Sequence, residues 1–144
     1  MTDVFRYKQL FKKVAFLLFL ALFFSGCATL QTVKQSQGKG IKRTFNFPYN
    51  DVYKAATYSV IGKGLEIAEQ SEERGYIYAT HGMSFFSWGE KVAIFIKKIN
   101  EDETTVEIVS KRAVTTNVFG PDWTDDIFNG MEVMLQNKNK KGGW

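Results

Sequence analysis

The 144-residue chain contains one cysteine, Cys27, and one histidine, His81, so its supply of strong nucleophiles and bases is small. A single thiol cannot form an intramolecular disulfide, and a single imidazole has no second imidazole with which to complete a common metal site. A nucleophilic serine needs a positioned base, and no serine lies in a recognisable elbow or triad motif. We therefore expect no catalytic residue and no metal site, and interpret His81 as a residue near the end of a strand. The serines considered are Ser71, Ser84, Ser87 and Ser110.

Two pairs of adjacent carboxylates are the remaining candidates for acid and base chemistry. Glu72 and Glu73 lie in a segment that reads as a turn, and Asp125 and Asp126 lie where a helix should begin. Adjacent acids in such places are usually solvated or stabilise the positive end of a helix. We expect neither pair to be catalytic.

Cys27 follows the most hydrophobic run of the sequence, the uncharged residues 14–24. In a helix these eleven residues rise only about 16 Å, roughly half of the hydrocarbon core of a bilayer, so a membrane-spanning helix is the less favoured interpretation. A positive segment followed by a short apolar run is instead the layout of an export signal. The positive segment contains Arg6, Lys8, Lys12 and Lys13.

The residues after the apolar run, Ser25, Gly26 and Cys27, resemble the lipobox of bacterial lipoproteins. The resemblance implies cleavage between Gly26 and Cys27, a diacylglycerol on the cysteine sulfur and usually an N-acyl lipid such as palmitate on the freed amino group. Phe24 stands where the family usually has leucine. The alternative is an uncleaved signal anchor with a small buried cysteine.

Ala28 bears on the membrane to which such a lipoprotein would be sorted. In lipoproteins of enteric bacteria, an aspartate directly after the cysteine tends to retain the protein at the inner membrane, and Ala28 is not an aspartate. The resemblance therefore implies an outer-membrane protein with its domain on the periplasmic side, without any cofactor beyond the lipid on Cys27.

Most of the excess of positive over negative charge belongs to the predicted signal segment, residues 1–26. The whole chain carries 19 Lys and Arg against 15 Asp and Glu, and residues 1–26 hold four of the basic side chains and one of the acidic. Residues 27–144 then keep 15 basic against 14 acidic side chains. Nucleic-acid binding requires clustered positive charge, so we expect no nucleic-acid partner.

Composition divides the chain into four parts. Residues 1–26 form the signal peptide, and residues 27–40 are polar without a sustained period, which indicates a lipidated flexible tether. As a coil, its 13 residues after the cysteine would span about 20 Å. Residues 41–137 are long enough for one globular domain, and residues 138–144 form a basic tail.

Periodicity within the domain predicts a strand, a helix, four strands and a second helix. The helices are expected to start after Asn50 and near Pro121, and the strands form two hairpins. This order predicts an α+β fold: a two-layer sandwich in which two helices cover one face of an antiparallel sheet of about five strands. The residues expected in the core are Val52, Tyr53, Ala56, Val60, Val92, Ile94, Ile96, Val106, Ile108, Trp123, Ile127, Met131 and Met134 or Leu135.

The element order and the stretch FPYNDVYKAA, residues 47–56, resemble the helix-grip modules of the small lipoprotein of the outer-membrane β-barrel assembly machine. Many small uncharacterised proteobacterial lipoproteins are similar. The resemblance implies this fold and an envelope location, and it carries no diagnostic motif.

Three aromatic residues crowd the connection between the two hairpins: Phe85, Phe86 and Trp88. Exposed aromatic clusters often mark interfaces, so one interpretation is a contact with another envelope protein or with the membrane face. In the alternative, the strands run further and the rings fill the edge of the core.

These features together favour a lipid-anchored, non-catalytic binding or scaffolding module of the bacterial envelope, with membrane lipid and an envelope protein as partners. Two alternatives remain at this point. Helix-grip sheets can curl around an apolar cavity, which would suit a carrier of small apolar ligands, and an envelope hydrolase would need one of the acids described above.

Overall fold

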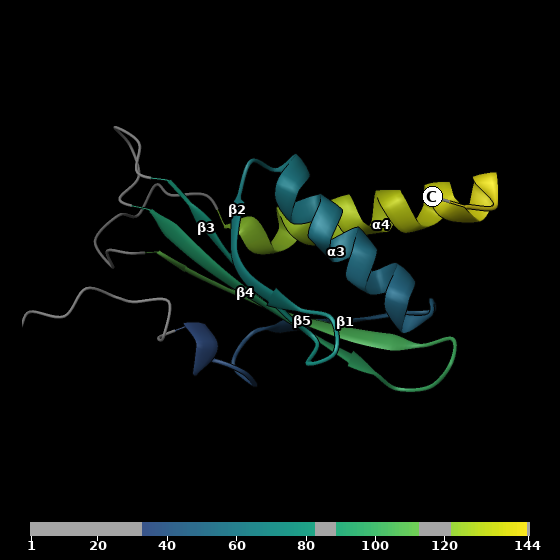
Figure 1. Cartoon of the computed structure of the whole chain (residues 1–144), viewed down its shortest axis with the longest axis horizontal. Coiled ribbons are helices and arrows are strands. Elements are labelled where there is room, and N and C mark those ends of the chain that lie inside the picture. Colours follow the sequence, from purple (N-terminus) through teal and green to yellow (C-terminus); the bar gives the residue numbers. More distant parts are fainter. Residues whose placement is uncertain (1–32, 83–88, 113–121, 144) are drawn as a thin grey trace, which may run out of the picture.

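The computed structural model describes residues 33–82, 89–112 and 122–143, which form two layers. A five-stranded antiparallel sheet is covered on one face by two helices, as Figure 1 shows, so the predicted α+β fold and element order are confirmed. The elements are β1 (Ile41–Phe45), α3 (Tyr49–Gly62), β2 (Glu66–Ser71), β3 (Tyr76–His81), β4 (Glu90–Lys98), β5 (Thr104–Arg112) and α4 (Trp123–Lys141).

The strands lie in the order β1-β5-β4-β3-β2, so the first strand of the domain pairs with the last. Residues 41–45 of β1 run antiparallel to residues 104–108 of β5. The hairpins β2–β3 and β4–β5 join through β3 and β4, where Ile77 lies opposite Ile94.

The main core lies between the sheet and the helices, because alternate strand residues point to that face. Val92, Ile94 and Ile96 of β4 are at most 5% exposed, and they meet the apolar sides of α3 and α4. The helices approach closely where Gly130 faces Ser59, whose hydroxyl donates a 2.8 Å hydrogen bond to the Ile127 carbonyl. The predicted core residues are buried, apart from Met134, which is partly buried.

Both helix starts follow from their capping residues, although one differs from the prediction. α3 begins at Tyr49 rather than after Asn50, because Pro48 supplies a fixed backbone angle and its carbonyl accepts from Asp51 and Val52. α4 begins as expected after Pro121, where the Asp122 side chain accepts from the Thr124 amide at 3.0 Å.

The end of α4 differs from the predicted domain boundary. The helix continues to Lys141 and ends at Gly142, which adopts φ +73°. Residues 138–141 of the expected basic tail are therefore helical. Their lysines lie where the negative end of the helix dipole favours positive charge.

The opposite face of the sheet, which we call the outer face, carries a second apolar cluster. Residues 33–40 lie on this face, on the side away from the helices in Figure 1. The expected flexible tether is thus packed over its second half, because Val33 and Ser36 are at most 1% exposed. The cluster consists of Val33, Tyr78, Ala93, Phe95 and Val109, with Tyr76 beside it.

Lys34 fastens this segment to the edge of the sheet. Its ammonium group pairs with Glu69 of β2, and Glu69 also accepts a 2.7 Å hydrogen bond from the Tyr76 hydroxyl. These two hydrogen bonds lower the pKa of Glu69, the one from Lys34 contributing most. The Lys34 ammonium also lies 5.0 Å from the centre of the Tyr78 ring, a cation–π contact.

The buried phenol of Tyr53 should make the stability of the folded protein vary with pH in the alkaline range. Burial raises the pKa of its hydroxyl from 10.0 to about 12, so the folded protein holds a proton that the unfolded chain releases above pH 10. Stability is therefore expected to fall as the pH rises from 10 to 12. The fall in melting temperature should be shallower in Tyr53→Phe than in the wild type. Tyr58→Phe provides the control because Tyr58 is 52% exposed, and equal slopes in the two variants would contradict the prediction.

Candidate functional site

The five residues predicted to carry lipidation, signal cleavage or a partner contact lie outside the described residues, so nothing in the structure tests them. Lipidation, signal cleavage and the aromatic contact therefore stay predictions. The residues are Gly26, Cys27, Phe85, Phe86 and Trp88.

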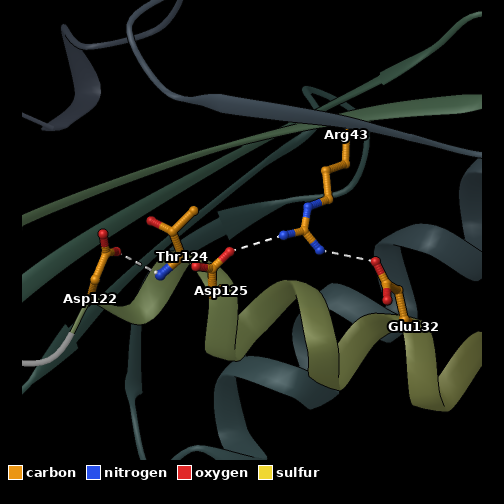
Figure 2. Close-up of polar contacts among 5 residues, drawn as sticks. All are labelled: Arg43, Asp122, Thr124, Asp125 and Glu132. Atoms are coloured by element: carbon orange, nitrogen blue, oxygen red, sulfur yellow. Dashed lines mark hydrogen bonds and ion pairs between the residues drawn. The ribbon is translucent and has the colours of Figure 1, made fainter.

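The adjacent carboxylates of α4 are each engaged in an ion pair. Asp125 accepts from Arg43 at 2.9 Å, and the other end of the same guanidinium donates to Glu132 at 3.0 Å (Figure 2). Asp126 pairs with Lys63 at 3.1 Å. The two acids thus fasten α4 to β1 and to the end of α3, and this arrangement does not unite them into one acid–base pair.

Glu72 and Glu73 lie in the turn between β2 and β3, as expected. The backbone carbonyl of Glu72 accepts a hydrogen bond from the Tyr49 hydroxyl, which ties this turn to the first residue of α3. Both side chains are exposed. The contact therefore positions the turn through its backbone, and the carboxylates themselves remain at the surface.

A buried carboxylate that sequence reasoning missed lies at the start of β4. Glu90 is 2% exposed and accepts a 2.9 Å hydrogen bond from the indole nitrogen of Trp123. His81 lies opposite it on β3, with Nδ1 3.6 Å from the same carboxylate oxygen. The His81 ring also lies against Trp123, with 5.1 Å between centroids.

These contacts give Glu90 a positioning role at the junction of the sheet and α4. The carboxylate holds the first residue of α4, and the His81 ring packs against the same indole. Alternation could have revealed Glu90, because it shares the parity of Val92 and therefore points to the core. Within the described ranges, no three His, Cys, Asp or Glu side chains are grouped so as to hold a metal ion.

An open pocket of about 580 Å³ lies on the outer face, and we call it the outer-face pocket. Its volume is in the range of small-molecule sites. Four separate segments contribute to it: residues 37–38, the strand β1, the β2–β3 turn and the hairpin β4–β5. Its charged side chains are Lys42, Arg74, Lys97 and Glu107, and Phe95 supplies an aromatic wall.

Strand pairing places these side chains on one face. Phe95 lies opposite Glu107, and Glu107 lies opposite Lys42 on the next strand. Lys97 follows Phe95 by two residues, so it points to the same side. The grouping is therefore set by the register of β1, β5 and β4.

Gly75 brings Arg74 to the pocket. Its carbonyl accepts a 2.7 Å hydrogen bond from the amide of Ile96, so the β2–β3 turn rests on β4. The contact is so close that a Cβ at position 75 would overlap the carbonyl oxygen of Ile96, and Gly75 has φ +69°. Only glycine satisfies both conditions without strain.

The carboxylate in the pocket is already bonded. Glu107 is 6% exposed and accepts a 2.7 Å hydrogen bond from the amide of Gly40, with the Lys42 ammonium 3.8 Å away. Lys97 is exposed, and the described residues supply no ion-pair partner for it. Three cationic side chains thus face one carboxylate, which leaves the outer-face pocket positively charged.

A second, shallower depression of about 330 Å³ adjoins this pocket through Arg74, Gly75, Ile96 and Lys97. It adds Lys98 and Glu73, so its charge balance is again positive. Sequence reasoning missed both depressions because their lysines and arginine come from segments far apart in the chain. The charge count of residues 27–144 gave no sign of the grouping.

No helix within the described part of the chain is both long and apolar enough to cross a bilayer. No protein-family model and no curated protein sequence matches this chain.

Proposed function

We propose that the protein is a lipid-anchored, non-catalytic binding module of the bacterial cell envelope, held by lipid on Cys27 at the periplasmic face of the outer membrane. The lipobox-like residues support the anchor, and Ala28 supports the choice of membrane. Its partners are membrane lipid, through Cys27, and an envelope protein.

One structural observation carries the binding role. Helices α3 and α4 cover one face of the sheet, and the opposite, outer face carries residues 33–40 and an open pocket. Val33, the first described residue, lies six positions after Cys27, a distance of at most about 20 Å in an extended chain. An anchor at Cys27 would therefore hold the outer face close to the membrane surface.

The packing of the main core favours this function over a carrier of apolar ligands. Such a carrier needs an empty space between sheet and helices. In this domain, Ile94 of the sheet and Ile127 and Phe128 of α4 point into the region between the two layers. All three are 0% exposed and belong to one core cluster, so side chains fill this region. The close approach of Gly130 to Ser59 brings the helices together over the sheet.

The anchor is tested by Cys27→Ser. Two or three acyl chains make release from a membrane negligible, since each buried CH₂ contributes about 0.8 kcal/mol. The wild type is expected in the membrane fraction with the mass of a lipidated chain cleaved before Cys27, and Cys27→Ser should be soluble or unprocessed. Ser25→Ala, which keeps the cysteine, serves as the control.

Two results would contradict the proposal. A membrane-bound wild type with the intact mass of the unmodified 144-residue chain would exclude lipidation. Sedimentation with inner-membrane markers in a sucrose gradient would exclude the outer membrane.

A further inference from the structure

We infer that the outer-face pocket binds a small phosphate-bearing ligand, either the headgroup of a phospholipid or a free phosphate ester. The inference rests on the proposed binding function and adds the chemical class of the ligand. It is carried by the charge, the shape and the rigid construction of the outer-face pocket.

The charge of the pocket suits an anion. Lys42 is partly neutralised by Glu107, which leaves Arg74 and Lys97 as the cations available to a ligand. Arg74 is exposed, and none of the described carboxylates forms an ion pair with it. A guanidinium presents a planar fork of donors that matches phosphate oxygens, and an ammonium adds a compact point charge.

The backbone position of Arg74 is set before any ligand arrives. The β2–β3 turn is fixed to β4 by the bond between Gly75 and Ile96, and the Arg74 amide donates to the Ser71 hydroxyl at 3.2 Å. On the far side, Gly40 lies so close to the Ile108 carbonyl that no side chain fits there. Both rims are therefore held by backbone contacts, which reduces the ordering cost of binding.

The shape suits a ligand with a polar end and a less polar body. Phe95 is 8% exposed and is held by an edge contact with Tyr78, with 6.0 Å between ring centroids. This ring provides a fixed apolar wall beside the cations. The opening faces away from the helices, on the side that residues 33–40 cross.

The test titrates the purified full-length protein in a non-ionic detergent with two probes, while binding is followed by calorimetry. The first is glycerol 3-phosphate, with glycerol as its uncharged counterpart. The second is phosphatidylglycerol in mixed micelles, compared with the same micelles without it. We expect saturable binding of at least one probe.

The variants localise the binding. Arg74→Ala combined with Lys97→Ala is expected to weaken the affinity at least tenfold. Lys54→Ala combined with Lys140→Ala removes the same charge from exposed positions on the helices and should change the affinity less than twofold.

Saturation by glycerol 3-phosphate identifies a free ester as sufficient, whereas binding of phosphatidylglycerol alone identifies the lipid headgroup. No binding of either probe, or an equal loss in both double variants, would overturn the inference. The intact mass reports lipidation independently of this titration. A failure of the titration is therefore distinguishable from a failure of the anchor.

Discussion

Gly75→Ala is expected to lower the free energy of unfolding by about 3 kcal/mol, because it adds a backbone penalty, a steric overlap and the loss of a hydrogen bond. At φ +69° a residue with a Cβ costs about 1 to 2 kcal/mol. The new methyl group also overlaps the Ile96 carbonyl oxygen, so the turn must move and its 2.7 Å bond to the Ile96 amide is weakened. Urea unfolding monitored by circular dichroism measures the change.

Gly64 provides a matched control for this prediction. It has φ +77°, and a Cβ there meets nothing within 4 Å. Gly64→Ala should therefore cost only the backbone penalty, about 1 to 2 kcal/mol. The difference between the variants reports the steric part, and equal losses would show that the turn moves aside freely. Gly75→Ala should also weaken phosphate binding, since Arg74 moves with the turn.

Glu90→Ala is the second substitution with a large expected effect, a loss of about 3 kcal/mol in the free energy of unfolding. It leaves the indole N–H of Trp123 without the acceptor now 2.9 Å away, and it empties space in a site that is 2% exposed. Thermal unfolding at neutral pH, with near-ultraviolet circular dichroism of the tryptophans, would measure both stability and local packing.

Glu90→Gln separates the hydrogen bond from the rest of the side chain. Its amide oxygen still accepts from Trp123, so most of the stability should remain. Trp123→Phe, Glu90→Ala and the combined variant form a double-mutant cycle. Because both single substitutions remove the same hydrogen bond, the double variant should lose less free energy of unfolding than the two single variants added together. Strict additivity would show that the bond does not link the two residues energetically.

The fold was predictable because polar turn segments separate short strand-like runs from two stretches with helical spacing. Val92, Ile94 and Ile96 place an apolar side chain at every second position, and the stripe from Trp123 to Leu135 has helical spacing. The limits of α3 were less predictable, since Pro48 and Asn50 both carry helix-start signals within three residues. Only the backbone geometry decides between them.

The packing of residues 33–40 was not predictable from composition. The segment is polar overall, and it is held by Val33, Ser36 and the Lys34–Glu69 pair rather than by a periodic apolar pattern. The outer-face pocket depends likewise on register, because Lys42 and Lys97 meet only through the strand between them. Pairings of that kind join residues too far apart in sequence for any local pattern to reveal.

Because β1 pairs with β5, the sheet can be completed only after the last strand of the domain is available. Residues 41–45 find their partners only when residues 104–108 are present, and Arg43 finds its carboxylates only when α4 is present. Contacts of such long sequence separation form slowly, because the intervening loop must close first. The first half of the domain therefore cannot complete its sheet until residues 104–108 have been synthesised, and a chain that entered an export pathway before that point would still be unfolded there.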